Sequence, residues 1–312
     1  MQRLRGSVVA VNGRNLDGWK TVAWNGISLR VPPQWEVSSL TKSYLQMDDG
    51  LGPVLELKWQ QVRGVFSHQD HVKKLARHSK SVAGLRFQQT SLPEEWRQAL
   101  RHFETKCFEW HGGGINGKGV VLYCPSSQQA SLLQFYQQGD LVSPEVHLGV
   151  LDSFRDQCEQ DMVRWSLFGL SALVPKSFEL VTYRFEPGRY QLEFKDRQQC
   201  VELKRWGPAD LLLRDTDLLH WFEKSRRELD CCRLTGIRED NYQGRPALYG
   251  KSGGWDSPAA RFWARISRRL PYVWIRIWHL SSQNQILGVV ARSLKSLDEQ
   301  LLEKICRNYD MA

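Results

Sequence analysis

The chain has 312 residues, a mass of 36.2 kDa and a formal charge of +9, with 41% hydrophobic and 25% charged residues. This composition excludes intrinsic disorder, because enough apolar side chains are present to offset the entropy lost on folding. The longest apolar runs stop far short of the roughly 20 residues that a bilayer core requires, so no membrane span is predicted. The length favours two domains or one large one.

The number and spacing of the cysteines indicate the redox state of the compartment in which the protein is found. The chain has 7 of them, an odd number at irregular spacings, so they cannot all pair within the chain. Such a pattern is typical of reducing conditions. The apolar residues 8–11 near the start are too few for the core of a signal peptide, so we expect no secretory leader. The sequence therefore predicts a cytoplasmic location.

In the first half, hydrophobic periodicity predicts three strands, a helix, three strands and a closing helix. The turn-forming residues 48–50 separate the second and third strands, and the apolar side chains of residues 70–82 recur at helical spacing. Ser153 and Asp156 have the spacing of a capping box, which places the start of the closing helix there. The predicted strands are residues 27–31, 44–47, 54–62, 105–110, 119–124 and 131–137.

The second half shows the same order of elements. Residues 217–229 are the counterpart of the first helix, and Ser296 with Glu299 predicts a second capping box before a closing helix. Three strands are expected between these helices, at residues 246–251, 260–267 and 272–280.

Three short matches in the same order and at nearly constant spacing indicate an internal duplication. Residues 26–37 align with 169–180, 55–59 with 201–206, and 148–150 with 287–289. The predicted fold class is therefore α+β, with two tandem copies of an antiparallel sheet flanked by helices (β-β-β-α-β-β-β-α per copy). The predicted divisions are an N-terminal extension over 1–19, a first repeat over 20–166 and a second over 167–312.

The opening strand of each half ends in Val-Pro and is followed by an aromatic residue, Trp35 in the first half and Phe178 in the second. This opening, together with the order of elements, resembles the PsbP and DcrB group of α/β/α sandwiches, here in tandem. The resemblance implies nonenzymatic binding, as photosystem subunits, trafficking factors or chaperones of other proteins. It implies no catalytic residues.

A glycine-rich stretch, residues 111–119, matches G-x-G-x-x-G and partly matches a P-loop and the H-G-G-G loop of esterases. Each match lacks the structural context that its motif requires. The two phosphate-binding motifs need a helix after the glycines, but a strand-like run over 120–123 follows them. The esterase loop needs a G-x-S-x-G motif for its nucleophile, and the chain has none. We interpret the stretch as a flexible hairpin loop, with phosphate binding as the alternative. Its candidate residues are His111, Gly112, Gly114, Gly117 and Lys118.

Four residues near one predicted helix, His68, Asp70, His71 and His78, have side chains that bind metals. No H-E-x-x-H, C-x-x-C or second cluster accompanies them, so we interpret them as the solvated start of that helix. The sequence indicates no metal and no cofactor.

An aromatic and basic hairpin is the strongest candidate for a binding surface. Alternation along residues 260–267 and 272–280 puts Trp and Arg side chains on one face of each predicted strand. Such a face is suited to a protein partner, or to stacking bases and neutralising phosphates; the third alternative is that a helix covers it. The candidate residues are Arg261, Trp263, Arg265, Arg268, Arg269, Tyr272, Trp274, Arg276 and Trp278.

These observations favour a nonenzymatic, cytoplasmic adaptor, chaperone or structural subunit whose partner is another protein. One alternative is a nucleic-acid or polyanion binder that uses the Trp and Arg hairpin, with binding that weakens steeply as salt is raised. A second alternative is an enzyme of unrecognised type with a site between the repeats.

Overall fold

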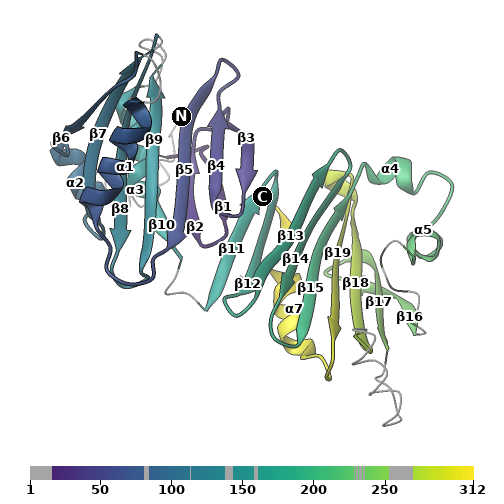
Figure 1. Ribbon diagram of the computed structural model, residues 1–312. Coiled ribbons are helices and arrows are strands. Elements are labelled where there is room, and N and C mark those ends of the chain that lie inside the picture. Colours follow the sequence, from purple (N-terminus) through teal and green to yellow (C-terminus); the bar gives the residue numbers. More distant parts are fainter. Residues whose placement is uncertain are drawn as a thin grey trace, which may run out of the picture. The chain divides into compact units, whose positions relative to one another are not determined.

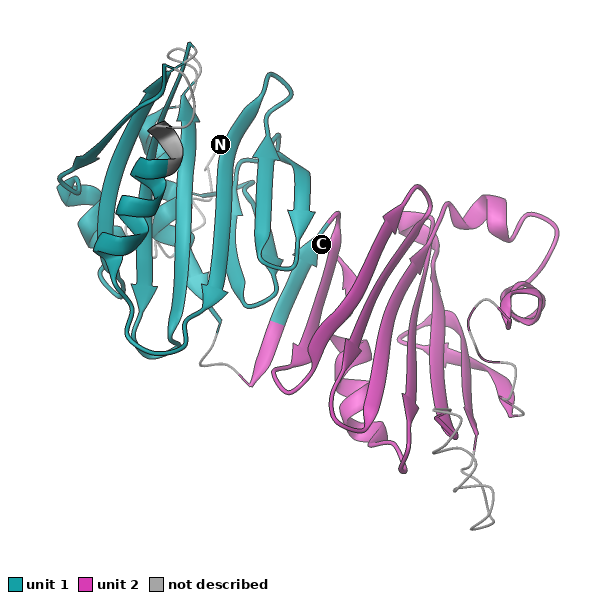
Figure 2. Ribbon diagram, viewed as in Figure 1, with its two compact units in different colours: residues 1–160, 164–167 teal, residues 161–163, 168–312 magenta. Residues whose placement is uncertain are grey.

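The computed structural model describes residues 16–80, 84–112, 114–137, 143–157, 161–227, 229, 231, 234, 236–252 and 270–312. The chain divides into two compact units (Figure 2). Unit 1 consists of residues 1–160 and 164–167, and unit 2 of residues 161–163 and 168–312.

Unit 1 contains a seven-stranded antiparallel sheet in the order β3-β4-β5-β9-β8-β7-β6 (Figure 1). A smaller antiparallel set in the order β10-β2-β1-β11 accompanies it. The strands are β1 (Lys20–Trp24), β2 (Ile27–Val31), β3 (Glu36–Thr41), β4 (Tyr44–Asp48), β5 (Pro53–Gln61), β6 (Arg86–Thr90), β7 (Glu104–Gly112), β8 (Ile115–Cys124), β9 (Gln129–Gln137) and β10 (Arg155–Asp156). Residues 164–167 of β11 (Met162–Leu167) also belong to unit 1.

Helices cover both faces of the large sheet in unit 1. On one face, Val72 of α1 (His68–Lys80) packs with Phe108 and Val121. On the other face, Phe135 contacts α2 (Glu94–Ala99) and α3 (Pro144–Ser153), because successive side chains of a strand point to opposite faces. The unit thus has two buried layers, one on each side of the sheet.

Unit 2 contains a seven-stranded antiparallel sheet in the order β13-β14-β15-β19-β18-β17-β16. Counted from the first strand of each sheet, this is the same strand order as in unit 1. β12 also pairs with β20. The strands are β12 (Leu170–Pro175), β13 (Glu179–Glu186), β14 (Arg189–Lys195), β15 (Gln199–Trp206), β16 (Ile237–Tyr242), β17 (Arg245–Ser252), β18 (Tyr272–Leu280), β19 (Gln285–Ser293) and β20 (Asp310–Met311).

Unit 2 also carries helices on both faces of its sheet. Trp221 and Phe222 of α5 (Leu218–Ser225) belong to a core with Ile275 and Ile277 of β18. Side chains of β18 that point the other way face α7 (Glu299–Arg307), through an ion pair between Arg276 and Glu303. The short α4 (Ala209–Leu212) precedes α5, and a 3-10 turn η1 (Ser281–Gln283) joins β18 to β19.

The structure corrects the predicted fold class. Of the described residues, 52% lie in strands and 19% in α-helices, so the protein is mostly antiparallel sheet and more β-rich than the α+β sandwich expected. Among the strands that the prediction missed are β3 and β16, which lie at sheet edges. Their side chains are largely exposed, so the apolar and polar alternation of a half-buried strand is weak there.

Many individual elements were predicted correctly. The strands expected in the first half are present as β2, β4, β5, β7, β8 and β9, and those expected at 246–251 and 272–280 as β17 and β18. The helices expected at 70–82 and 217–229 overlap α1 and α5. The strand expected at 260–267 lies outside the described residues.

Both predicted capping boxes are wrong. Ser153 is the last residue of α3, and its hydroxyl accepts a hydrogen bond from the backbone amide of Arg30 at 2.9 Å. Asp298, rather than Ser296, caps α7, because its carboxylate accepts a hydrogen bond from the amide of Leu301 at 3.1 Å. A hydroxyl and an acid at capping spacing therefore did not locate the start of either helix.

The aligned glycines Gly26 and Gly169 occupy matching turns. Each is the second residue of a two-residue hairpin turn, with φ of 94° and 76°, in the left-handed region that glycine favours. In each turn the first residue's carbonyl accepts a hydrogen bond from the neighbouring sheet. Trp59 Nε1 donates to Asn25 at 3.1 Å, and an Arg205 guanidinium nitrogen donates to Phe168 at 2.8 Å.

No helix in the described part of the chain is both long enough and apolar enough to span a bilayer.

Candidate functional site

The structure places part of the predicted Trp and Arg surface inside unit 2. Trp274 and Trp278 on β18 are 1% and 0% exposed, on the sheet face that packs against α7. Both edges of β18 are paired, with β17 and with β19. The other candidates, Arg261, Trp263, Arg265, Arg268 and Arg269, lie outside the described residues.

Arg276, on the same face of β18, is a structural side chain. Its guanidinium forms ion pairs with Glu303 of α7 and, at 3.3 Å, with Asp240 of β16. It also lies 4.7 Å from the ring centroid of Tyr242. The helix-covered alternative therefore describes Trp274, Arg276 and Trp278, and the two indoles are not available to stack on bases.

The glycine-rich stretch forms the hairpin between β7 and β8. Gly112 ends β7, Gly114 lies in the turn with φ of 80°, and Gly117 lies within β8 beneath the ring of Trp110. A Cβ at Gly117 would come within 2.3 Å of that ring. These glycines lead into the strand β8 and not into a helix N-terminus of the kind that binds phosphate, and Gly117 makes room for an aromatic side chain.

The polar candidates of this hairpin bind neighbouring side chains. Lys118 Nζ lies 2.9 Å from Glu109 Oε1 and 5.4 Å from the ring centroid of Trp96. His111 Nδ1 lies 3.1 Å from Asn116 Oδ1. These contacts are typical of a stable hairpin.

The histidines at the start of α1 contact the backbone. His68 Nε2 lies 3.0 Å from the carbonyl of Glu104, and His71 Nδ1 lies 3.0 Å from the carbonyl of Ser67. The side chain of His78 is not among those that the structure describes. Within the described ranges, no three His, Cys, Asp or Glu side chains are grouped so that they could hold a metal ion.

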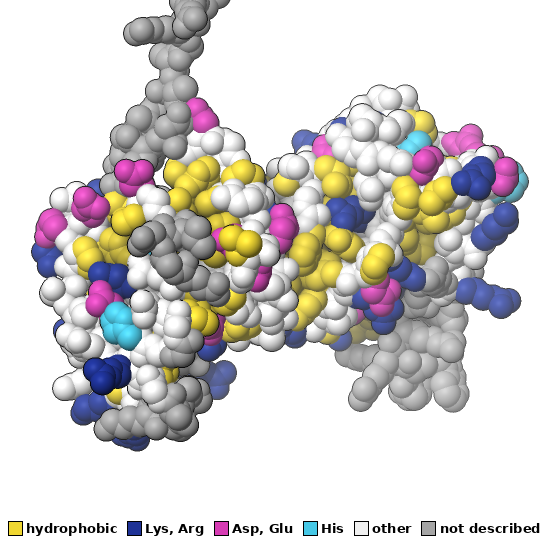
Figure 3. All heavy atoms as spheres, turned by 90° about the horizontal axis from the view of Figure 1, so that it is seen from above, with side chains coloured by type: hydrophobic (Ala, Val, Ile, Leu, Met, Phe, Trp, Pro, Cys, Tyr) yellow, Lys and Arg dark blue, Asp and Glu magenta, His cyan; other side chains and the backbone are white. Residues whose placement is uncertain are grey.

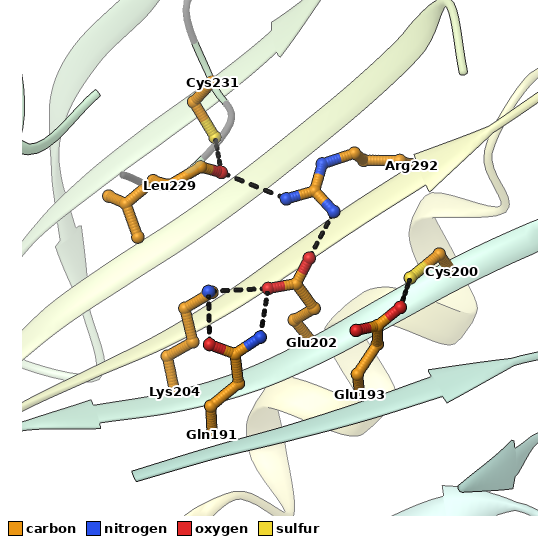
Figure 4. A network of polar contacts seen from close by, with 8 residues as sticks. All are labelled: Gln191, Glu193, Cys200, Glu202, Lys204, Leu229, Cys231 and Arg292. Carbon is orange, nitrogen blue, oxygen red and sulfur yellow. Dashed lines mark hydrogen bonds and ion pairs between the residues drawn. The ribbon is translucent and has the colours of Figure 1, made fainter. Parts of the chain in front are cut away.

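A buried polar network in unit 2 was not recognised from the sequence (Figure 4). Glu202 and Lys204 of β15 point to the same face of the sheet, with Lys204 Nζ 2.6 Å from Glu202 Oε2. Arg292 of β19 pairs with the other carboxylate oxygen. Gln191 of β14 bridges the pair, since its amide nitrogen donates to Glu202 at 3.1 Å and its oxygen accepts from Lys204 at 3.1 Å.

The charges of this network balance once Glu193 is counted. Two cations, Lys204 and Arg292, share one carboxylate, that of Glu202. Next to it, the thiol of Cys200 donates to Glu193 at 3.5 Å, and burial together with the nearby carboxylates raises the pKa of Cys200 to about 12. The thiol therefore stays protonated at neutral pH, and the carboxylate of Glu193 on β14 balances the second cation.

A pocket of about 490 Å³ opens above the network. Its residues come from β13, β14, β15 and β19, a part of the sheet that has no described helix in front of it in Figure 1. Thr182 and Arg184 at its margin are exposed. Four basic and two acidic side chains line it, so it attracts anions. The lining residues are Thr182, Tyr183, Arg184, Arg189, Gln191, Glu193, Glu202, Lys204 and Arg292.

Unit 1 has a related network on β5, where Glu56 is 6% exposed and pairs with Lys58. Tyr136 and Gln134 of β9 also donate to this carboxylate. Burial acts to raise the pKa of Glu56, but the hydrogen bonds from Lys58, Tyr136 and Gln134 outweigh it and leave the pKa below its ordinary value. Lys58 is half exposed, whereas its unit 2 counterpart Lys204 is buried, so unit 2 encloses its charges more fully.

The sequence did contain a signal for these networks. Glu-Leu-Lys occurs in both aligned segments, at residues 56–58 and 202–204, within otherwise apolar strands. Alternation along a strand puts the two charges of each segment on one face, in the middle of a sheet. Buried charges of this kind need partners, but the sequence does not show that Arg292 and Tyr136 supply them.

The charge of +9 is not gathered into one patch on the face viewed in Figure 3, where Lys and Arg side chains lie among Asp and Glu side chains. The basic pocket on β13–β15 is therefore a local feature, built by particular side chains.

Comparisons with known proteins found only remote similarity. No family model and no curated protein matches the sequence. The Ran-binding protein Mog1p of Saccharomyces cerevisiae is 10% identical, with a TM-score of 0.32 over 49% of this chain and 96% of its own. The immunity protein TplEi of T6SS from Pseudomonas aeruginosa is 9% identical, with a TM-score of 0.33 over 94% of this chain and 97% of its own. At TM-scores below 0.5, these similarities carry no argument about this chain.

Proposed function

We propose that this chain is a nonenzymatic protein-binding adaptor or structural subunit, and that the open face of β13, β14 and β15 binds an acidic segment of its partner. The observation that carries the proposal is the pocket above Glu202, where Arg184, Arg189, Lys204 and Arg292 outnumber the two acidic side chains. This excess of cations, which Arg184 and Arg189 add to the balanced network, favours an anionic partner group.

The form of the face supports a polypeptide partner. β13 presents the exposed Thr182 and Arg184 beside the half-buried Gln191 and Glu193 of β14. These side chains provide donors and acceptors that can contact several residues of a partner. Arg side chains bind carboxylates through two parallel hydrogen bonds and are frequent in binding hot spots. An Asp- or Glu-containing segment would complement the excess of positive charge in this lining.

Binding by side chains is favoured over pairing of a partner strand with the sheet edge. The edge strand β13 has a register shift between Leu180 and Thr182, where it pairs with β14. Such bulges twist an edge strand and disfavour the addition of another strand. The edge strand β3 of unit 1 has a shift between Val37 and Ser39.

The rest of the proposal follows from the sequence. The resemblance to the PsbP and DcrB group supports a nonenzymatic binding role, and the odd, irregularly spaced cysteines support a cytoplasmic location. We assign no cofactor.

The test is affinity capture of partners by the full chain, analysed by quantitative mass spectrometry after nuclease treatment. The binding-face variant carries Arg184→Glu and Arg189→Glu. The control carries Arg214→Glu and Arg227→Glu, which change the net charge equally at exposed positions outside the pocket. We expect one set of protein partners with the wild type and the control that is lost with the binding-face variant. Equal recovery by all three proteins, or recovery that nuclease abolishes, would overturn the proposal.

A further inference from the structure

We infer a second ligand site in unit 1, an apolar pocket that binds an amphipathic carboxylate of the fatty-acid class. This inference goes beyond the proposed protein-binding function, because it concerns another unit and a small molecule.

The pocket lies where α1 meets the sheet and has a volume of about 550 Å³, within the range of small-molecule sites. Val121 of β8 and Leu132 of β9 are direct cross-strand neighbours in its lining, next to Ala130. Leu75 of α1 lines it from the helix side. These side chains provide an apolar surface for a hydrocarbon chain.

The unit 2 sheet explains why this space exists. Gln60 pairs with Ala130 at the position where unit 2 pairs Trp206 with Ile286. In unit 2 the indole of Trp206 packs edge-on against Trp221 of α5, with ring centroids 5.2 Å apart, and both Trp206 and Ile286 belong to the core. The smaller Ala130 and the polar Gln60 leave the corresponding space in unit 1 open.

The charged side chains of the pocket select the head group. Lys58 and Lys74 line it, and no Asp or Glu does so among its described lining residues. Lys58 Nζ lies 5.3 Å from the ring centroid of Tyr44 and is half exposed, and Lys74 is exposed on α1. Lys58 also pairs with Glu56, so the exposed Lys74 at the margin of this apolar pocket supplies the cation that complements one negative charge on an apolar chain.

The same lining disfavours a peptide. The strands that contribute to it, β4, β5, β8 and β9, have both edges paired with neighbouring strands. Their backbone groups are therefore unavailable to a peptide main chain, whose binding by sheets depends on an open edge. A fatty acid needs only apolar contacts and a cation for its carboxylate.

The test is isothermal titration calorimetry of the full chain with dodecanoate, below its aggregation concentration, with dodecyltrimethylammonium as the ligand of opposite charge. We expect saturable binding of one dodecanoate and no matching binding of the cation. Lys74→Glu should weaken dodecanoate about fivefold. The control Lys73→Glu, an exposed neighbour that does not line the pocket, should bind as the wild type does.

A second variant tests the pocket itself. Ala130→Ile reproduces the larger residue of unit 2 and should abolish binding while circular dichroism and the thermal midpoint show a folded protein. The proposal is overturned if dodecanoate does not bind, if the ammonium binds equally, or if folded Ala130→Ile binds normally. The Arg184→Glu, Arg189→Glu variant should still bind dodecanoate, so this proposal and the protein-binding proposal fail separately.

Discussion

Lys204 Nζ lies 2.6 Å from Glu202 Oε2 in the middle of the unit 2 sheet, and each side chain is 5% exposed. Removing two charges from water is costly, and their attraction offsets that cost only with good geometry and further hydrogen bonds. Arg292 and Gln191 supply those bonds here. The arrangement stabilises the sheet little in itself, but it positions cations beneath an open face.

We expect Lys204→Met to destabilise unit 2 by about 3 to 5 kcal/mol, because it removes one partner of a buried ion pair. The double variant with Glu202→Gln should be much less destabilised than the sum of the single variants, since Gln still accepts a hydrogen bond from Arg292. Urea unfolding followed by circular dichroism measures both effects. Strictly additive free energies would contradict the coupling.

The stability of unit 1 should fall at acidic pH because of His147. This side chain is 3% exposed and its ring stacks on Phe135 with centroids 4.2 Å apart. Burial, together with the charge of Lys118, lowers the pKa of His147 to about 4. The unfolded chain binds the proton near the ordinary pKa of 6.5, so the stabilising contribution is complete above pH 6.5 and is lost as pH falls toward 4.

This loss should be about 2 kcal/mol at pH 5 and reach about 3 kcal/mol at pH 4. The check is urea unfolding at pH 7, 6 and 5 for the wild type and His147→Leu. The stability advantage of the wild type should shrink as the pH falls, since the variant has no proton to bind at this position. A difference that stays constant across this range would show that His147 does not carry the effect.

Gly119 of β8 should tolerate no side chain. A Cβ there would lie 2.3 Å from the ring of Phe108 and 2.8 Å from the carbonyl of Leu133, so we expect Gly119→Ala to cost about 1 to 3 kcal/mol through overpacking. Gly114→Ala, in the open turn, should cost no more than about 1 kcal/mol, from its positive φ alone. Thermal unfolding measures the stability of both variants. A larger loss of stability for Gly114→Ala than for Gly119→Ala would refute the prediction that Gly119 is the more tightly packed position.

Arg276 should matter for stability and Arg184 should not. Arg276→Met removes the ion pairs with Glu303 and Asp240 and leaves their carboxylates without this partner, so we expect a loss of about 2 kcal/mol or more. Arg184→Met changes a side chain that is 62% exposed and should shift stability by no more than about 0.5 kcal/mol. Equal effects in urea unfolding would count against the structural role of Arg276.

The correct predictions concerned features with a local signal. The alternation of apolar and polar residues identified β4, β5 and β18. The aligned glycines Gly26 and Gly169, which lie in matching turns, marked the similar first segments of the two halves. The fold class was wrong because exposed edge strands such as β16 carry no such alternation. The sequence left open whether a helix covers the predicted Trp and Arg face, because alternation tells which side chains share a face but not what covers that face.

The sequence by itself determined the strand runs, the turn chemistry and the Glu-Leu-Lys segments, because each depends on residues close together in the chain. Only the tertiary structure decided that α7 buries Trp274, that Arg292 meets Glu202, and that Ala130 leaves space where unit 2 places Ile286. These outcomes depend on packing between segments far apart in the sequence, and sequence periodicity contains no information about which distant segments meet.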